Sequence, residues 1–116
     1  VKLLGSRNDT VELYQGMDVF FLPSFFEGLP VTGVEAQAMG LPMVVSDTVT
    51  CEMVYTDLVD YVSLNDTPEA WASRLEIALR KNAKREQYAD RLKLSNFSNI
   101  GCGNRLEQVY SRWVNG

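Results

Sequence analysis

Two glutamates with seven residues between them, Glu27 and Glu35, are the side chains in this sequence best suited to chemistry. A carboxylate accepts several hydrogen bonds, so two of them can hold the hydroxyl groups of one polyhydroxy ligand. Glu27 follows an apolar, strand-like run, whereas Glu35 falls inside a helical pattern that begins at Pro30. We therefore expect one carboxylate on a loop and the other a turn and a half into a helix, where a phosphorylated polyhydroxy ligand would bind.

The elements that must position these glutamates are short strands alternating with helices. Helical patterns cover residues 10–16 and 30–39, and apolar runs predict strands at residues 1–4, 18–22, 43–45 and, more briefly, 61–64. Near-continuous apolar strands that alternate with helices are typical of a parallel sheet covered on both faces. The predicted fold class is α/β, a Rossmann-like parallel sheet flanked by helices.

The segment around Pro30 is the predicted binding site. In an open parallel sheet, ligands bind beyond the carboxyl ends of the strands, where helix amino termini present unpaired N–H groups. Pro30 has no N–H and suits the first helical position, so the amides of Val31 and Thr32 are predicted to be free donors for a diphosphate. Gly28 permits a close approach that a side chain would block.

Small residues define one face of the predicted helix. Gly33, Ala36 and Gly40 recur at helical spacing, which lets the helix lie close to the sheet. Glu35 lies off that face, so its carboxylate can accept hydrogen bonds from a ribose diol, while Glu27 can do the same for a sugar ring. The ordinary alternative is that both glutamates are solvated surface residues.

The second half of the sequence is predicted to be helical. Thr67 is a candidate N-cap with Pro68 at the first helical position, and a weaker amphipathic helix covers residues 84–94. Turns are predicted at residues 95–99 and 101–103. An apolar stripe then runs through residues 106–114. This stripe either packs in the core of the chain or packs against a partner or a missing domain.

Composition limits the classes of protein that fit. With 116 residues, 46% of them apolar, we expect one domain with one core. No apolar run approaches the roughly 18 residues of a membrane span, and no leader is recognisable, so a soluble, cytoplasmic and truncated chain is expected. Histidine is absent, which excludes a Ser-His-Asp triad and a histidine metal centre, and the two cysteines lack the spacing of a zinc site or disulfide framework.

The charge is unevenly distributed. The net charge of −4 argues against a nucleic-acid partner, whose affinity would depend on neutralised phosphates. Residues 1–73 carry two basic and eleven acidic groups, a net of −9, whereas residues 74–116 carry nine basic and four acidic groups, a net of +5. Two interpretations of the basic half are solvated helix faces and peripheral association with anionic lipid at the inner face of the membrane.

Two strings carry a family resemblance: DVFFLPSFFEGLP at residues 18–30 and EAQAMGLPMVVSD at residues 35–47. They resemble the donor-binding half of retaining glycosyltransferases of the GT-B fold, sequence family four. The similarity runs from residue 4 to residue 79 and is closest to bacterial enzymes that assemble capsular or extracellular polysaccharide. Beyond residue 84 only a helical pattern remains.

The resemblance implies roles for the candidate site. Glu27 would contact hydroxyls of the transferred sugar as the catalytic residue, and Glu35 would hold the ribose of a nucleotide-diphosphate sugar. No metal and no cofactor are implied. The base of the nucleotide would lie nearer residues 5–9. Phe25 and Phe26 either wall the sugar pocket or pack in the core. The residues implied to bind the nucleotide sugar are Gly28, Leu29, Pro30, Val31, Thr32 and Glu35.

The resemblance also implies a domain organisation. Residues 1–116 would be the donor-binding domain, incomplete at its N-terminus, of the truncated C-terminal half of a GT-B enzyme. An acceptor-binding domain and a basic pair that grips the diphosphate would precede it. The full-length protein would be a hexosyltransferase in polysaccharide biosynthesis with a saccharide or lipid-linked acceptor, and the isolated fragment is expected to be inactive.

Other functions remain open at this point. A nucleotide-sugar epimerase or a glycogen-synthase-like polymerase would share the donor crevice. A standalone interaction module would use residues 106–114 as a docking face. A receiver-type signalling domain would place Asp18 and Asp47 near strand ends, but the paired acidic residues and late lysine of that class are not in place.

Overall fold

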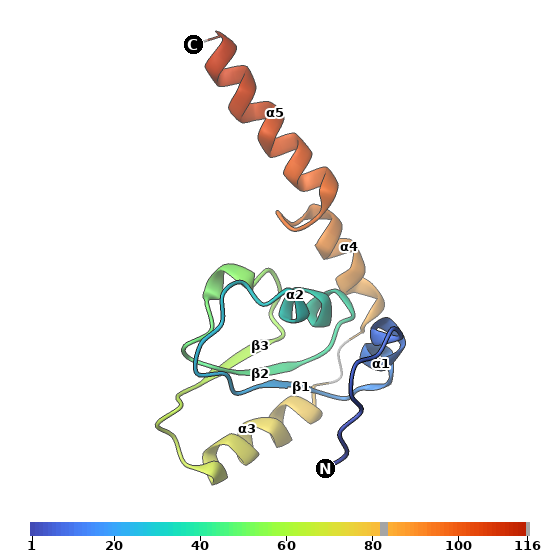
Figure 1. Ribbon diagram of the computed structural model, residues 1–116, viewed down its shortest axis with the longest axis vertical. Helices are drawn as coiled ribbons and strands as arrows, with labels where there is room; N and C mark the ends of the chain where they lie inside the picture. The colour runs from blue at the N-terminus through green and yellow to red at the C-terminus, as the bar shows by residue number, and fades with distance from the viewer. Residues whose placement is uncertain (82–83, 116) are drawn as a thin grey trace.

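A computed structural model describes residues 1–81 and 84–115 and contains a three-stranded parallel sheet with helices on both faces (Figure 1). The strands are β1 (Phe20–Leu22), β2 (Met43–Ser46) and β3 (Val59–Val62), in the spatial order β1-β2-β3. The register sets Phe20 opposite Met43 and Met43 opposite Val59. The predicted Rossmann-like α/β fold class is therefore confirmed.

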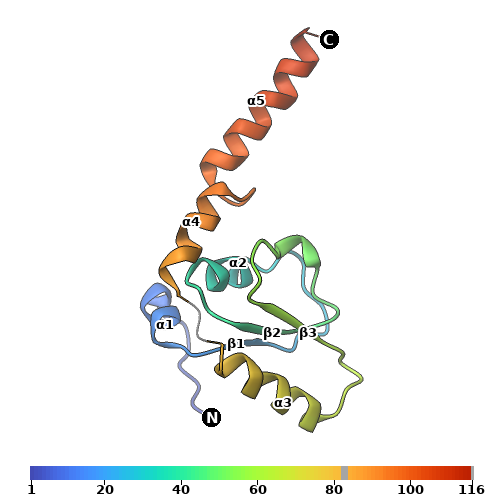
Figure 2. The same ribbon diagram turned by 180° about the vertical axis from the view of Figure 1, so that it is seen from behind.

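The central strand β2 is buried at every residue because it faces helices on two sides. Met43 and Val45 belong to the core cluster that includes α2 (Val31–Ala38), whereas Val44 packs in the cluster of α3 (Pro68–Leu79). Figures 1 and 2 show α2 and α3 on opposite faces of the sheet. Since side chains alternate along a strand, burial on both faces accounts for the uninterrupted apolar run of β2.

The remaining elements surround this core or leave it. Helix α1 (Thr10–Gly16) precedes β1, the short 3₁₀ helix η1 (Cys51–Met53) follows β2, and α4 (Glu86–Leu94) packs beside α2. Helix α5 (Asn99–Asn115) projects away from the sheet (Figure 1). Its described apolar side chains, those of Leu106, Val109 and Tyr110, are exposed. The apolar stripe is therefore not packed internally at these positions; Trp113 and Val114 lie outside the side chains that the structure describes.

The start of α3 and the predicted bounds of α1 are confirmed. The Thr67 side chain accepts a 3.3 Å hydrogen bond from the amide of Ala70, and Pro68 occupies the first helical position. Helix α4 also forms within the predicted segment. Such local signals succeed because the capping groups are adjacent in sequence.

Several predicted boundaries are wrong, for identifiable reasons. Residues 1–4 form no strand, since no strand of the described sheet lies beside them to accept hydrogen bonds, and Leu3 is 93% exposed. The predicted strand at 61–64 begins two residues earlier, at Val59, where β3 pairs with β2. Residues 101–103, predicted as a turn, lie within α5, which begins at Asn99 despite its glycines.

Gly40 ends α2 and does not belong to its sheet-facing surface, contrary to the prediction. Its φ of +66° is left-handed, its amide donates to the carbonyl of Gln37, and the amide of Leu41 donates to that of Ala36. These two bonds form a Schellman motif, which explains why glycine is favoured here. Gly33 and Ala36 do lie on the buried face as predicted.

Replacing Gly40 with alanine is expected to destabilise the chain by about 2 kcal/mol. The new methyl would strain a left-handed residue and would lie 2.6 Å from the backbone Cα of Arg85, which is rigid compared with a side chain. Urea unfolding followed by circular dichroism would measure the change. Gly16→Ala, with no atom within 4 Å of the added methyl, is the control and is expected to be neutral or mildly stabilising; equal effects for both variants would contradict the prediction.

Candidate functional site

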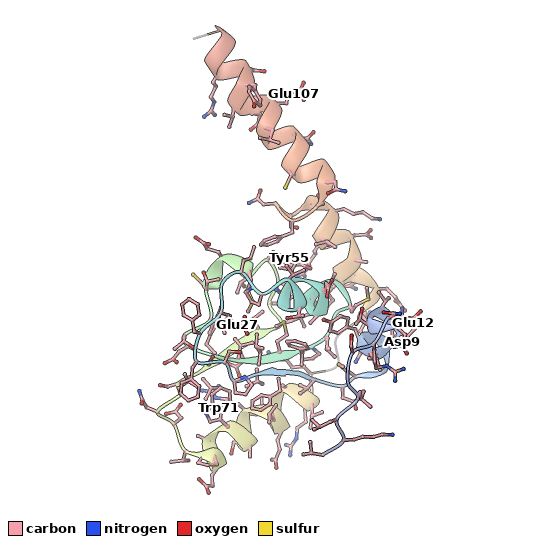
Figure 3. The ribbon with its side chains drawn as sticks, viewed as in Figure 1. Asp9, Glu12, Glu27, Tyr55, Trp71 and Glu107 are labelled. Atoms are coloured by element: carbon pink, nitrogen blue, oxygen red, sulfur yellow. The ribbon has the colours of Figure 1, made fainter. Side chains whose placement is uncertain are left out.

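The loop that carries Glu27 is tied to the carboxyl end of β2. The hydroxyl of Thr48 donates a 2.7 Å hydrogen bond to the carbonyl oxygen of Ser24, and the hydroxyl of Ser46 donates to the same oxygen. The hydroxyl of Ser24 in turn contacts Glu27 Oε1 at 2.9 Å. Glu27 is thus held half-buried above the strand ends, as Figure 3 shows. The supporting hydroxyl residues were not identified from the sequence.

The amino terminus of α2 is open. Pro30 is the N-cap, one position before the predicted one, and its carbonyl accepts hydrogen bonds from the amides of Gly33 and Val34. The preceding amides, those of Val31 and Thr32, have no protein acceptor among the described residues. Both residues are exposed. The two free donors that the sequence predicted are therefore present, although Pro30 lies outside the helix proper.

The electrostatics of this terminus suit an anion. No side chain caps the first turn of α2, and no acidic residue lies in that turn. Unpaired amides and the aligned peptide dipoles give a helix amino terminus about half a positive charge. A phosphate placed there would gain hydrogen bonds and a favourable field at once.

Gly28 and Leu29 complete the turn before α2. Both are exposed, and a Cβ added to Gly28 would meet no atom within 4 Å. No contact among the described residues therefore requires glycine at this position. The space above Gly28 is open, and the close approach of a ligand there stays a prediction.

Glu35 is supported by a different part of the chain. The hydroxyl of Tyr14, at the end of α1, donates a 3.1 Å hydrogen bond to Glu35 Oε2. Tyr14 is 6% exposed; burial first, and then the neighbouring Glu35 carboxylate, raises the pKa of Tyr14 to about 12. The hydroxyl therefore remains a donor that orients Glu35, whose carboxylate stays exposed and keeps further acceptor capacity.

Replacing Tyr14 with phenylalanine is expected to weaken the pH dependence of stability above pH 10. Because folding raises the pKa of Tyr14 from 10.0 to about 12, its stabilising effect is complete below pH 10 and is lost as the pH rises towards 12. Burial gives Tyr55 a similar pKa of about 12, so part of the loss persists in the variant. Urea unfolding at about pH 8 and about pH 11 would measure it.

The control for this experiment is Tyr110→Phe, since Tyr110 is exposed on α5. It is expected to leave the pH dependence unchanged. If the stability of Tyr14→Phe fell as steeply with pH as that of the unsubstituted chain, the contribution of Tyr14 would be refuted.

Gln37 fixes the position of α2 and was also missed from the sequence. Its side chain is fully buried; Nε2 donates to the carbonyls of Gly33 and Met53, while Oε1 accepts from the amide of Tyr55 and the hydroxyl of Thr56. Gly33 lies close to the same segment, since an added Cβ would be 2.7 Å from Met53 Sδ. These contacts hold α2 against η1 and the residues that follow it.

The pair Phe25 and Phe26 does not pack in the core. Their side chains are 83% and 88% exposed, so the core alternative is wrong. Phe25 instead borders an open groove of about 500 Å³ between β1 and α3, whose lining includes Phe21 and Trp71. The rings of Phe21 and Trp71 meet edge-on with centroids 5.5 Å apart.

The structure thus places the predicted site residues around the amino end of one helix. Glu27 lies on the loop before α2 and is held by Ser24. Glu35 lies on α2, about 6 Å further along the helix axis than Val31, and is held by Tyr14. Among the described residues, no three His, Cys, Asp or Glu side chains gather in a way that suits a metal ion. None of the helices described is long and apolar enough to cross a membrane.

Comparison with known proteins identifies a family to which the chain is similar. The family described as "Glycosyl transferases group 1" matches residues 1–81. A protein of Bacillus subtilis whose name is "Putative glycosyltransferase EpsF" is 37% identical over 89 residues, which cover 76% of this chain and 23% of that protein. The chain therefore spans less than a quarter of this relative. No solved structure matches significantly.

Two further relatives are named for their reactions. The N,N'-diacetylbacillosaminyl-diphospho-undecaprenol alpha-1,3-N-acetylgalactosaminyltransferase of Campylobacter jejuni is 47% identical over 60 residues, covering 52% of this chain and 16% of that protein. The UDP-Gal:alpha-D-GlcNAc-diphosphoundecaprenol alpha-1,3-galactosyltransferase of Escherichia coli is 51% identical over 45 residues, covering 39% of this chain and 12% of that protein.

Proposed function

This chain belongs to the glycosyl transferases group 1 family, and from that membership we propose that it is the donor-binding part of a hexosyltransferase that takes its sugar from a nucleotide-diphosphate donor. The observation that carries the proposal is the uncapped amino terminus of α2, with a supported carboxylate on the loop before it and another within the helix. The family match also favours this function over the receiver-domain alternative.

Each part of the donor has a partner in the proposal. The amides of Val31 and Thr32 bind the diphosphate, and the turn through Gly28, Leu29 and Pro30 lets it approach. Glu27 accepts hydrogen bonds from hydroxyls of the transferred sugar, and Glu35 accepts them from the ribose. No metal or organic cofactor is assigned, because the helix terminus and its amides supply the positive field.

The reaction proposed is transfer with retention of configuration. The bond between the anomeric carbon and the diphosphate oxygen breaks, and a bond from the acceptor oxygen to that carbon forms on the same face. The proton of the acceptor hydroxyl passes to the departing diphosphate oxygen. Negative charge accumulates on the departing nucleoside diphosphate, where the fixed dipoles at α2 stabilise it more than they stabilise the ground state. The chain's own contribution is to bind, orient and stabilise this leaving group.

The proposed acceptor is a saccharide or a lipid-linked saccharide, as the names of two relatives suggest. We propose that a separate N-terminal domain of the full-length enzyme supplies the acceptor wall, with peripheral association at the inner face of the membrane. Positioning an acceptor hydroxyl against the anomeric carbon supplies many kcal/mol of rate enhancement, so the 116-residue chain alone is expected to be inactive. Measurable glycosyl transfer by the chain alone would refute this part of the proposal.

Binding of nucleotide sugars to the chain tests the donor site directly. A charge-assisted hydrogen bond contributes about 1.5–3 kcal/mol, so without the basic pair expected in the preceding segment the Kd should be about millimolar. In a calorimetric titration with uridine and guanosine diphosphate sugars, at least one of these sugars should bind with a Kd of about millimolar. The Glu35→Gln variant should bind that sugar about tenfold more weakly. Glu76→Gln, an exposed glutamate of α3, is the control; unaltered affinity in Glu35→Gln would contradict the assignment.

A further inference from the structure

A second cavity adjoins the donor site on the other flank of α2. It has a volume of about 470 Å³, within the usual range for ligand pockets. Three segments build it: the turn before α2, η1 with the residues after it, and the end of α4 with the turn that follows. Its lining includes Leu29, Glu52, Tyr55, Leu94, Asn96 and Phe97.

The lining combines flat apolar surface with unused polar groups. The rings of Tyr55 and Phe97 lie with centroids 5.7 Å apart, and Figure 3 shows Tyr55 between α2 and the turn after α4. The side chains of Glu52 and Asn96 are exposed and have no hydrogen-bond partner among the described residues. A carboxylate offers acceptors and an amide offers both donors and an acceptor, so together they match neighbouring hydroxyl groups.

We infer that this cavity is a saccharide subsite for the glycosyl acceptor, a role that rests on the proposed donor function. A pyranose ring has an apolar C–H face, which suits the Tyr55 and Phe97 walls, and a rim of hydroxyls, which suits Glu52 and Asn96. Leu29 belongs both to this cavity and to the turn that approaches the donor diphosphate. A sugar bound here would therefore lie next to the transferred sugar.

The helix geometry argues against the nucleoside as the occupant. Glu35, assigned to the ribose, is directed to Tyr14 of α1. Gly33 and Gln37 are each two residues from Glu35, about 200° away around the helix axis, and both face Met53 beside the cavity. The ribose and the cavity thus lie on opposite flanks of α2, which leaves the acceptor as the substrate that fits.

Amide chemical shifts of the labelled chain test this subsite with three probes, the methyl α-glycosides of glucose, galactose and N-acetylglucosamine. At least one should shift residues 52–55 and 94–97 in a saturable way below about 100 mM. Asn96→Ala should raise its Kd about fivefold, and Glu52→Gln should also weaken binding. Asn65→Ala, an exposed asparagine away from the cavity, is the control and should leave the Kd unchanged.

Three outcomes would overturn the inference. No saturable shift with any of the glycosides would do so, as would shifts confined to residues 28–35, which would place the saccharide in the donor site. Shifts of residues 52–55 and 94–97 with uridine diphosphate alone would assign the cavity to the nucleoside. Failure of the donor site is seen separately, as loss of any response to nucleotide sugars at residues 28–35.

Discussion

Replacing Glu27 with alanine is expected to lower kcat/KM for glycosyl transfer by about 100-fold or more in an enzyme that joins the proposed donor-binding region to the proposed acceptor domain. The carboxylate would make at least two charge-assisted hydrogen bonds to sugar hydroxyls, each contributing about 1.5–3 kcal/mol. These bonds position the anomeric carbon, so the loss should appear in kcat as well as in KM. Initial rates with a labelled nucleotide sugar would measure it.

The control for Glu27 is Glu76→Ala, which removes an exposed carboxylate from α3. It should leave kcat/KM within about twofold. Glu27 also contacts the Ser24 hydroxyl, so thermal unfolding of both variants is needed to show that the loop remains folded. Near-normal transfer by a stable Glu27→Ala enzyme would remove this residue from the proposed catalytic role.

Replacing Gln37 with leucine is expected to reduce the free energy of unfolding by about 3 kcal/mol. The substitution leaves the buried carbonyl of Met53 and the amide of Tyr55 without their side-chain partner, and each such group costs about 1–3 kcal/mol. Leucine has a similar volume, so lost hydrogen bonds rather than a cavity would account for the change. Urea unfolding of the two chains would give the difference.

Gln87→Leu is the matched control, because Gln87 is exposed on α4. Its effect should stay within about 0.5 kcal/mol. A loss below about 1 kcal/mol in Gln37→Leu would mean that other contacts suffice to hold α2 against the loop after η1. The positioning role of Gln37 would then be wrong.

Features that depend on neighbouring residues could be predicted from the sequence. The Thr67 cap and Pro68 define the start of α3 within a few residues, and the apolar run of β2 identifies a strand buried on both faces. The free amides of Val31 and Thr32 follow from helix geometry alone, which holds whether Pro30 is the N-cap or the first helical residue.

Features that depend on distant partners could not be predicted. Tyr14 meets Glu35 across 21 residues of sequence, and Gln37 meets Met53 across 16. No periodicity identifies such pairs, because packing between elements creates them. The same dependence explains residues 1–4, whose apolar pattern requires a neighbouring strand that the described sheet does not provide.

The start of α5 and the partner of its apolar stripe could not be predicted from the sequence either. Its glycines predict turns, yet the helix continues through them, so local propensity did not decide the start of this element. Its exposed residues Leu106, Val109 and Tyr110 follow the predicted apolar stripe without a covering surface in the described part of the chain. Periodicity correctly identified the helix but contains no information about its partner.

The proposed donor site requires the amino end of α2 to bind the diphosphate of a nucleotide sugar between Glu27 and Glu35. The most direct measurement is a titration of the isotope-labelled chain with uridine and guanosine diphosphate sugars, followed by amide chemical shifts. Saturable changes are expected at about millimolar ligand, largest for Val31 and Thr32 and extending to residues 27–35. Unchanged amides at α2, or changes confined to another surface, would contradict it.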